Sequence, residues 1–258
     1  MKQKERNINA AFYIPFAYLY GVRLQSVPKM VSWLLLYILP TAFYSGLTTL
    51  SYLLVLFATF SLYELGYIFN DTVAVRRETN PSLRLTEDQT AYFFAHRWTI
   101  LATRLFIAAA CLGILSTVHH TSYIVHLSLS LVIMLALFAI YNRWRNRYNV
   151  FLYVWLVFSR FIPFMCLDPH SDLDYILLFV SYPLLIGLER FSMPAYRWSF
   201  MRPLIPNEET KAVFRVAYYF IALVILAPYC YFTHVSVYAL APIALLALYR
   251  ILRWIIDK

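Results

Sequence analysis

Apolar residues gather along this chain in blocks that are separated by short polar segments. A helix of ~20 apolar residues crosses the ~30 Å hydrocarbon core of a bilayer, and eight blocks approach or exceed that length. They cover residues 28–46, 50–69, 98–118, 122–141, 150–167, 173–189, 213–232 and 235–254. The pattern predicts an all-α integral membrane protein with about eight transmembrane helices.

Residues 8–22 form a further aromatic and apolar run, which is short for a span. We expect an interfacial or re-entrant helix there rather than a ninth span. No small-residue cleavage site follows the basic start at Lys2 and Lys4, which argues against a secretory signal. Because no linker or low-complexity tract interrupts the chain, we predict one transmembrane domain over residues 1–258, with an interfacial segment at 1–27.

Composition and charge agree with a membrane setting. Apolar residues make up 62% of the chain and charged residues 14%, whereas soluble domains carry about a quarter charged residues. The net charge is +9, and the loops near 46–49, 119–121, 168–172 and 233–234 contain no lysine or arginine. By the positive-inside rule, the basic loops and both termini face the cytoplasm, as in a bacterial inner membrane. Topology explains most of the excess charge, so a nucleic-acid partner is not needed.

A polar string at the end of the second block is the first candidate site. Asn70-Asp71 is followed by Glu78 and Arg84. Carboxylates can hold a divalent metal, and guanidinium groups can hold phosphate. Glu64, Asp71 and Glu78 recur every seven residues, so on a helix they drift by only about 20° per heptad and share one face. The structural alternative makes Asp71 a helix-end residue bonded to backbone or Arg76, and Glu78 a loop acid.

Charged residues inside the blocks are the second signal. A charge at the centre of a span costs ~2.5–3.5 kcal/mol on insertion scales and normally faces a polar interior. Glu64 and Arg160 lie at such positions, and an ion pair between them explains both as structure. We favour the alternative, in which Arg160 reaches a substrate phosphate from a cavity. Arg104 lies nearer a boundary and is expected to extend its charge to the interface.

The polar segments after the second, fourth and sixth blocks resemble those of the UbiA superfamily of intramembrane prenyltransferases, including its branch that transfers phosphoribose to polyprenyl phosphate. The family's Asn-Asp-x-x-Asp-x-x-x-Asp frame is matched at Asn70, Asp71 and Glu78, with Ala74 in place of the middle acid. The segments Asn80 to Arg84 and Tyr141 to Arg145 are similar to two further family segments. A second acidic motif is reduced to Glu189-Arg190.

The resemblance implies a UbiA-like bundle of eight or nine helices that acts on a polyprenyl lipid. The reaction would transfer a prenyl group from its diphosphate, or a phosphorylated sugar to a polyprenyl phosphate. Asp71 and Glu78 would be catalytic and, with Glu64, would hold Mg²⁺. The residues implied in substrate binding are Asn70, Arg84, Tyr141, Arg143, Arg145, Arg160, Glu189 and Arg190.

Two other functions stay open. The acids missing at Ala74 and after the sixth block favour a catalytically degenerate protein that binds lipid or assists assembly. A small transporter would use Glu64 and Arg160 as coupling charges, although no inverted repeat supports it.

Overall fold

The computed structural model describes residues 8–77, 82–144, 146–196 and 198–256, and within these ranges it contains helices and no strand. The α-helices are α1 Val27–Trp33, α2 Leu39–Ser45, α3 Thr49–Thr72, α4 Glu87–Leu115, α5 Thr121–Arg143, α6 Asn149–Ser159, α7 Asp172–Ser181, α8 Pro183–Ser192, α9 Glu208–Phe232 and α10 Ala241–Ile256. The short 3₁₀ turns are η1 Asn9–Phe12, η4 Ala74–Arg77, η5 Ile162–Met165, η6 Pro194–Tyr196, η7 Ser199–Leu204 and η8 Val237–Leu240. Two π-helical turns are η2 Leu19–Arg23 and η3 Leu34–Ile38.

Local sequence signals set the ends of the long helices. Thr48 caps α3 by accepting a hydrogen bond from the Ser51 amide. Reciprocal capping boxes begin α4, at Thr86 with Gln89, and α9, at Asn207 with Thr210. These side chains satisfy amide groups that have no partner within the helix.

Six helical segments of the described residues are long and apolar enough to cross a membrane: Val27–Ser45, Thr49–Arg77, Glu87–Leu115, Thr121–Arg143, Glu209–Phe232 and Val237–Ile256. A seventh is formed if α7 and α8, which are bent by 44°, count as one span. The protein is therefore a multi-pass, all-α membrane protein. The predicted count of eight or nine spans is not confirmed, because the block at 150–167 divides into the short α6 and η5. The direction of the helices across the membrane stays a prediction from charge.

The described chain divides into two compact units, each built from separate stretches of sequence. Unit 1 takes residues from Met1–Ser32, Leu47–Trp144 and Ile162–Asp168, and unit 2 from Trp33–Gly46, Arg145–Phe161 and Pro169–Lys258. Each unit is described by itself.

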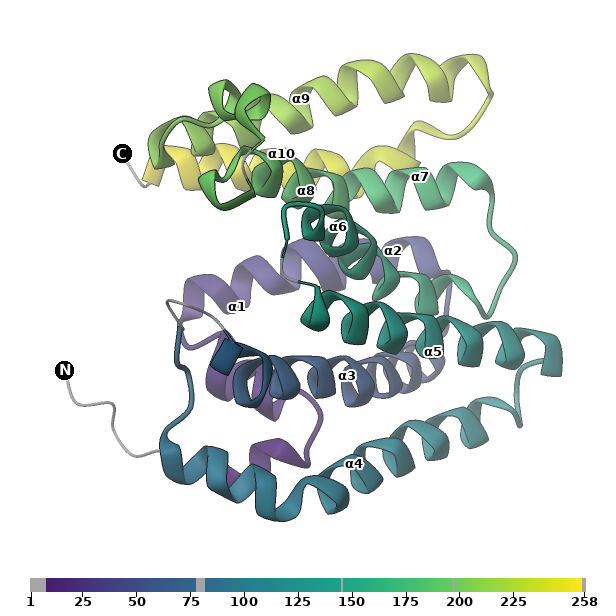
Figure 1. The fold of residues 1–258 in the computed structure, drawn as a ribbon. Helices are drawn as coiled ribbons and strands as arrows, with labels where there is room; N and C mark the ends of the chain where they lie inside the picture. The colour runs from purple at the N-terminus through teal and green to yellow at the C-terminus, as the bar shows by residue number, and fades with distance from the viewer. Residues whose placement is uncertain (1–7, 78–81, 145, 197, 257–258) are drawn as a thin grey trace. The chain divides into compact units, whose positions relative to one another are not determined.

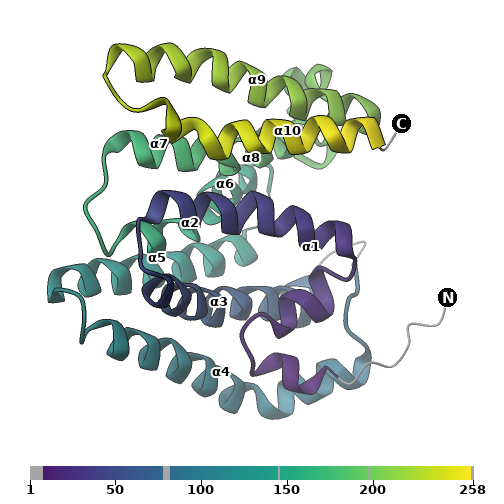
Figure 2. The same cartoon turned by 180° about the vertical axis from the view of Figure 1, so that it is seen from behind.

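In unit 1, α3 packs between α4 and α5, and both views show the three helices side by side (Figures 1 and 2). Gly66 allows α3 to approach α5 closely. A Cβ atom at this position would collide with the ring of Phe138 on α5. A small residue at this crossing is typical of packed membrane helices.

In unit 2, tyrosine hydroxyls bind the carbonyl groups that broken helices leave free. The helix pair α7 and α8 breaks at Tyr182, next to Pro183, which has no amide hydrogen to donate. Tyr218 donates to the Val180 carbonyl at 2.6 Å, and Tyr219 donates to the Ser181 carbonyl at 2.7 Å. Backbone groups at membrane depth must find partners inside the protein, so these bonds make the break possible.

Candidate functional site

A buried ion pair joins α3 to α4. The Arg104 Nη1 group donates to Glu64 Oε2 at 2.7 Å, and neither side chain is exposed. The other bonds of the pair go to the N-terminal segment. Arg104 donates to the carbonyls of Ala11 and Phe12, both at 2.9 Å. Glu64 accepts from the amides of Phe16 and Leu19, at 3.0 and 2.6 Å.

This arrangement follows from a break in the N-terminal segment. Residues 9–12 form the 3₁₀ turn η1, residues 19–23 form the π-helical turn η2, and between them Phe16 has a φ of 69°, in the left-handed region. The break leaves carbonyls on one side and amides on the other. A cation suits the carbonyl end of a helical turn and an anion suits the amide end. Glu64 and Arg104 therefore supply the partners that water supplies outside a membrane.

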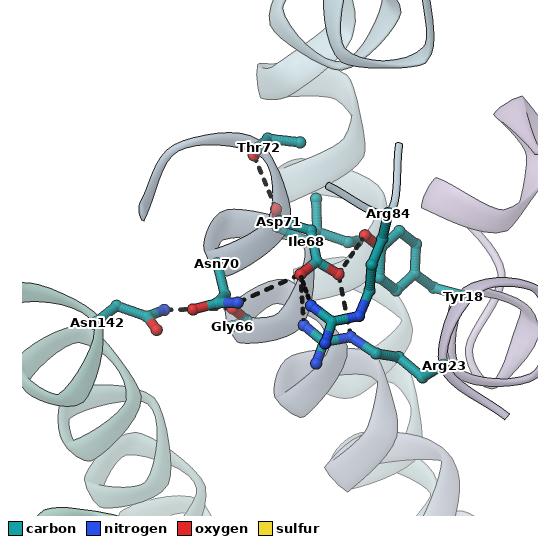
Figure 3. Close-up of polar contacts among 9 residues, drawn as sticks. All are labelled: Tyr18, Arg23, Gly66, Ile68, Asn70, Asp71, Thr72, Arg84 and Asn142. Carbon is teal, nitrogen blue, oxygen red and sulfur yellow. Dashed lines mark hydrogen bonds and ion pairs between the residues drawn. The ribbon is translucent and has the colours of Figure 1, made fainter. Parts of the chain in front are cut away.

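Asp71 lies two turns further along α3, and four side chains bind its carboxylate (Figure 3). Arg23 donates to both oxygens, at 3.0 and 2.7 Å, and Arg84 donates to Oδ1 at 3.1 Å. The Tyr18 hydroxyl donates to Oδ2 at 2.9 Å, and Asn70 Nδ2 donates to Oδ1 at 3.2 Å. Burial and the negative charge of Asp71 raise the pKa of Tyr18 above its usual range, so the hydroxyl keeps its proton and donates.

Glu64 and Asp71 thus share one face of α3, as their seven-residue spacing predicts. The two carboxylates bind residues 16–23 of the N-terminal segment. Glu78, the third acid of the predicted stripe, lies outside the described residues. Among the described residues, no group of three histidine, cysteine, aspartate or glutamate side chains lies close enough to hold a metal ion.

The structure departs from one expectation and from the structural alternatives weighed from the sequence. The Arg104 side chain, expected to extend to an interface, is fully buried and pairs with Glu64, for which the structural alternative was Arg160. Asp71 pairs with Arg23 and Arg84, whereas Arg76 lies over the Phe94 ring at 5.0 Å. The reason is the register of α3 against α4 and the N-terminal segment, which the spacing within α3 does not reveal.

Three of the predicted substrate-binding residues lie in unit 2. Arg160 follows α6 and stacks on the rings of Tyr37, Phe161 and Tyr182, at 4.9, 5.4 and 5.6 Å. Glu189 is buried, and Arg215 grips both of its oxygens at 2.6 and 2.8 Å. The neighbouring Arg190 lies over the Tyr153 ring at 4.2 Å. Whether these residues act on a substrate stays a prediction.

A cavity of about 980 Å³ opens between α3, α4 and α5 of unit 1. Its basic lining residues are Arg77, Arg97 and Arg143, and their side chains are exposed. Apolar groups make up most of the remaining wall, including Phe69, Trp98, Leu101, Leu105, Leu135 and Phe138. None of the described residues that line the cavity is acidic. The cavity therefore combines an apolar wall with positively charged side chains.

The cavity brings together residues that the sequence did not group. Arg143 was a predicted phosphate ligand, whereas Arg77 and Arg97 were not among the predicted site residues. Tyr141 is half-buried beside Phe138, with ring centres 6.4 Å apart, and Arg145 lies outside the described residues. The only signal in the sequence was that one arginine follows each of two blocks and another lies near the start of a third.

Comparison with known proteins adds no identity: no protein-family model, curated protein or solved structure matches the chain. The resemblance to the UbiA superfamily therefore rests on the short motifs alone.

Proposed function

We propose that this membrane protein binds an anionic lipid in the cavity between α3, α4 and α5. The ligand would have a phosphate-type head group, held by Arg77, Arg97 and Arg143, and a long hydrocarbon or isoprenoid chain along the apolar wall. Guanidinium groups bind phosphate oxygens through paired, charge-assisted hydrogen bonds. This is the lipid-binding alternative that the depleted acidic motifs favour.

The observation that carries the proposal is the composition of the cavity lining. Ligand pockets commonly have volumes of about 300–1,000 Å³ and apolar linings with a few convergent polar groups. This cavity has a volume of about 980 Å³, and its described lining residues include three arginines and no acid. A cation would be repelled by the arginines, and a fully apolar ligand would make no favourable contact with their charges. An amphiphile with a negative head group fits both parts of the lining.

The state of Asp71 favours binding over metal-dependent transfer. Its carboxylate already accepts bonds from Arg23, Arg84, Tyr18 and Asn70. A magnesium ion at Asp71 would have to displace these donors, and two nearby guanidinium groups oppose a second positive ion.

Transfer from a polyprenyl diphosphate is the second candidate function. Asn70, Asp71 and Arg84, which the UbiA-like motifs single out, do meet at the end of α3. The Arg84 side chain is 36% exposed, so a diphosphate can reach it. Magnesium and Glu78 remain part of this second proposal.

The test is binding of oleyl phosphate to the purified full chain in detergent, measured by native mass spectrometry. We expect Arg77→Gln and Arg143→Gln each to weaken binding by roughly five- to tenfold, the loss of one partly solvated charge-assisted bond. Arg76→Gln is the matched control, because it removes the same charge next to Arg77, while Arg76 lies over Phe94 and does not line the cavity. Equal losses in all three variants would mean a general charge effect and would overturn the proposal.

Geranylgeranyl diphosphate with and without magnesium separates the two functions. Magnesium-dependent binding that Asp71→Asn abolishes would favour the transferase. Binding that ignores magnesium and responds to Arg77→Gln would favour the lipid-binding protein.

A further inference from the structure

Asn142 lies in the wall of the cavity, on α5 beside Arg143. Its side chain is 3% exposed. The Nδ2 group donates to the Gly66 carbonyl of α3 at 3.2 Å, as Figure 3 shows. That bond fixes the orientation of the amide, because the oxygen cannot take the same place. The atom left over is the carbonyl oxygen Oδ1.

Asn142 Oδ1 accepts no hydrogen bond from the described residues. A buried acceptor without a donor costs about 1–3 kcal/mol, and most buried polar groups in native proteins have partners. The bond to Gly66 therefore accounts for the amide nitrogen of Asn142 and not for its oxygen. A donor alone would suffice for the bond to the Gly66 carbonyl, so the oxygen has no structural role among the described residues.

We infer that the ligand of this cavity carries a neutral hydrogen-bond donor, a hydroxyl or amide N–H, that donates to Asn142 Oδ1. This inference rests on the proposed function. The donor is neutral because Arg77, Arg97 and Arg143 line the same cavity and repel an ammonium group. The ligand class is thus an anionic single-chain lipid with a hydroxyl or amide near its head group, and a lysophosphatidate has this chemistry.

The place of Asn142 sets where the donor lies along the ligand. Its neighbour on the chain is Arg143, and Phe138 and Ala139, about one turn back along α5, belong to the lining. The donor therefore lies between the anionic group and the hydrocarbon chain. Oδ1 itself has almost no accessible surface. The proposed bond therefore requires a lining side chain to shift. Such side-chain rearrangements commonly accompany binding.

Three oleoyl lipids of equal charge test the inference on the full chain in detergent. The first is lysophosphatidate, the second is its 2-deoxy analogue, and the third is its 2-methoxy analogue, which keeps the oxygen and loses the donor. We expect lysophosphatidate to bind about tenfold more tightly than both analogues, since a site with a buried acceptor discriminates against ligands that leave it unpaired. Asn142→Leu should bring the three affinities together.

The affinity ratio is taken within each protein sample, so partial loss of folded protein does not change it. Asn142→Ala serves if Asn142→Leu does not fold, and the ratio in the native chain is decisive without any variant. Ser130→Ala on the same helix is the control, because Ser130 bonds to the Leu127 carbonyl and does not line the cavity. It should keep the tenfold preference.

Two results would overturn the inference, and only one of them would also refute the lipid-binding function. Equal, tight binding of the three lipids to the native chain would refute the donor contact and leave the lipid-binding function standing. Absence of binding for all three, in a folded sample, would refute the lipid-binding function and the inference with it.

Discussion

Glu64 on α3 and Arg104 on α4 form a fully buried ion pair, and each side chain also binds the backbone of the N-terminal segment. A buried ion pair alone rarely adds stability, because the cost of removing two charges from water offsets their attraction. This pair has a second task. It supplies partners to the carbonyls of Ala11 and Phe12 and to the amides of Phe16 and Leu19.

We expect Glu64→Leu and Arg104→Met each to lower the free energy of unfolding by about 3–5 kcal/mol, because each leaves a buried charge uncompensated. The double variant should not recover stability, since four backbone groups of the N-terminal segment stay without partners. Thermal unfolding in detergent measures both effects. A double variant as stable as the native chain would mean that the pair only compensates itself.

Asp71→Asn tests the structural role of the acid. The change leaves Arg23 and Arg84 facing a neutral amide that has one acceptor oxygen in place of two. We expect a loss of about 1–3 kcal/mol and a similar loss for Arg23→Gln, with the double variant losing less than the sum of the two. A double-mutant cycle by thermal unfolding measures the coupling. Strict additivity would contradict the ion pair.

Gly66→Ala should lower stability by about 1–3 kcal/mol, the usual cost of overpacking a well-filled site. The added Cβ atom meets the Phe138 ring, and both residues line the cavity, so affinity for oleyl phosphate should fall with stability. Gly113→Ala on α4 is the matched control. A Cβ atom there meets nothing within 4 Å, and alanine is the better helix former. It should hold or raise the melting temperature; a drop equal to that of Gly66→Ala would refute the close approach.

Arg215→Lys tests the two-point grip on Glu189 in unit 2. Lysine keeps the charge and loses the paired hydrogen bonds at 2.6 and 2.8 Å. We expect a cost of about 1 kcal/mol for lysine and a larger one, about 3 kcal/mol, for Arg215→Leu, which leaves the buried carboxylate unpaired. Chemical denaturation of the two variants gives the order. Equal stability of the lysine variant and the native chain would mean that charge alone suffices.

Much of the fold follows from the hydrophobic pattern, because membrane helices are recognised in a sequence as long apolar blocks. The second, third, fourth, seventh and eighth predicted blocks each fall within or largely within a single helix. The breaks were harder to predict. Pro183 marks one, yet whether proline kinks or ends a helix depends on partners such as Tyr218 and Tyr219, which lie far along the chain.

Only part of the candidate site could be predicted from the sequence, namely Glu64 and Asp71 on one helix, and their contacts could not. The spacing of Glu64 and Asp71 correctly placed them on one face of α3. It could not show that the N-terminal segment covers that face, because Arg104 and Tyr18 reach it through helix register and through a turn with a positive φ at Phe16. The cavity arginines come from three helices, so no local motif reveals them.

Photocrosslinking with an alkyl phosphate that carries a diazirine in its chain tests the lipid-binding cavity most directly. Mass spectrometry of the crosslinked full chain maps the labelled residues. We expect adducts on the apolar wall, at Leu101, Leu105 and Leu135, that excess oleyl phosphate competes away and that the double variant Arg77→Gln, Arg143→Gln loses. Labels spread evenly over the exposed apolar residues of α9 and α10, unchanged by competitor or by loss of the arginines, would contradict a lipid site between α3, α4 and α5.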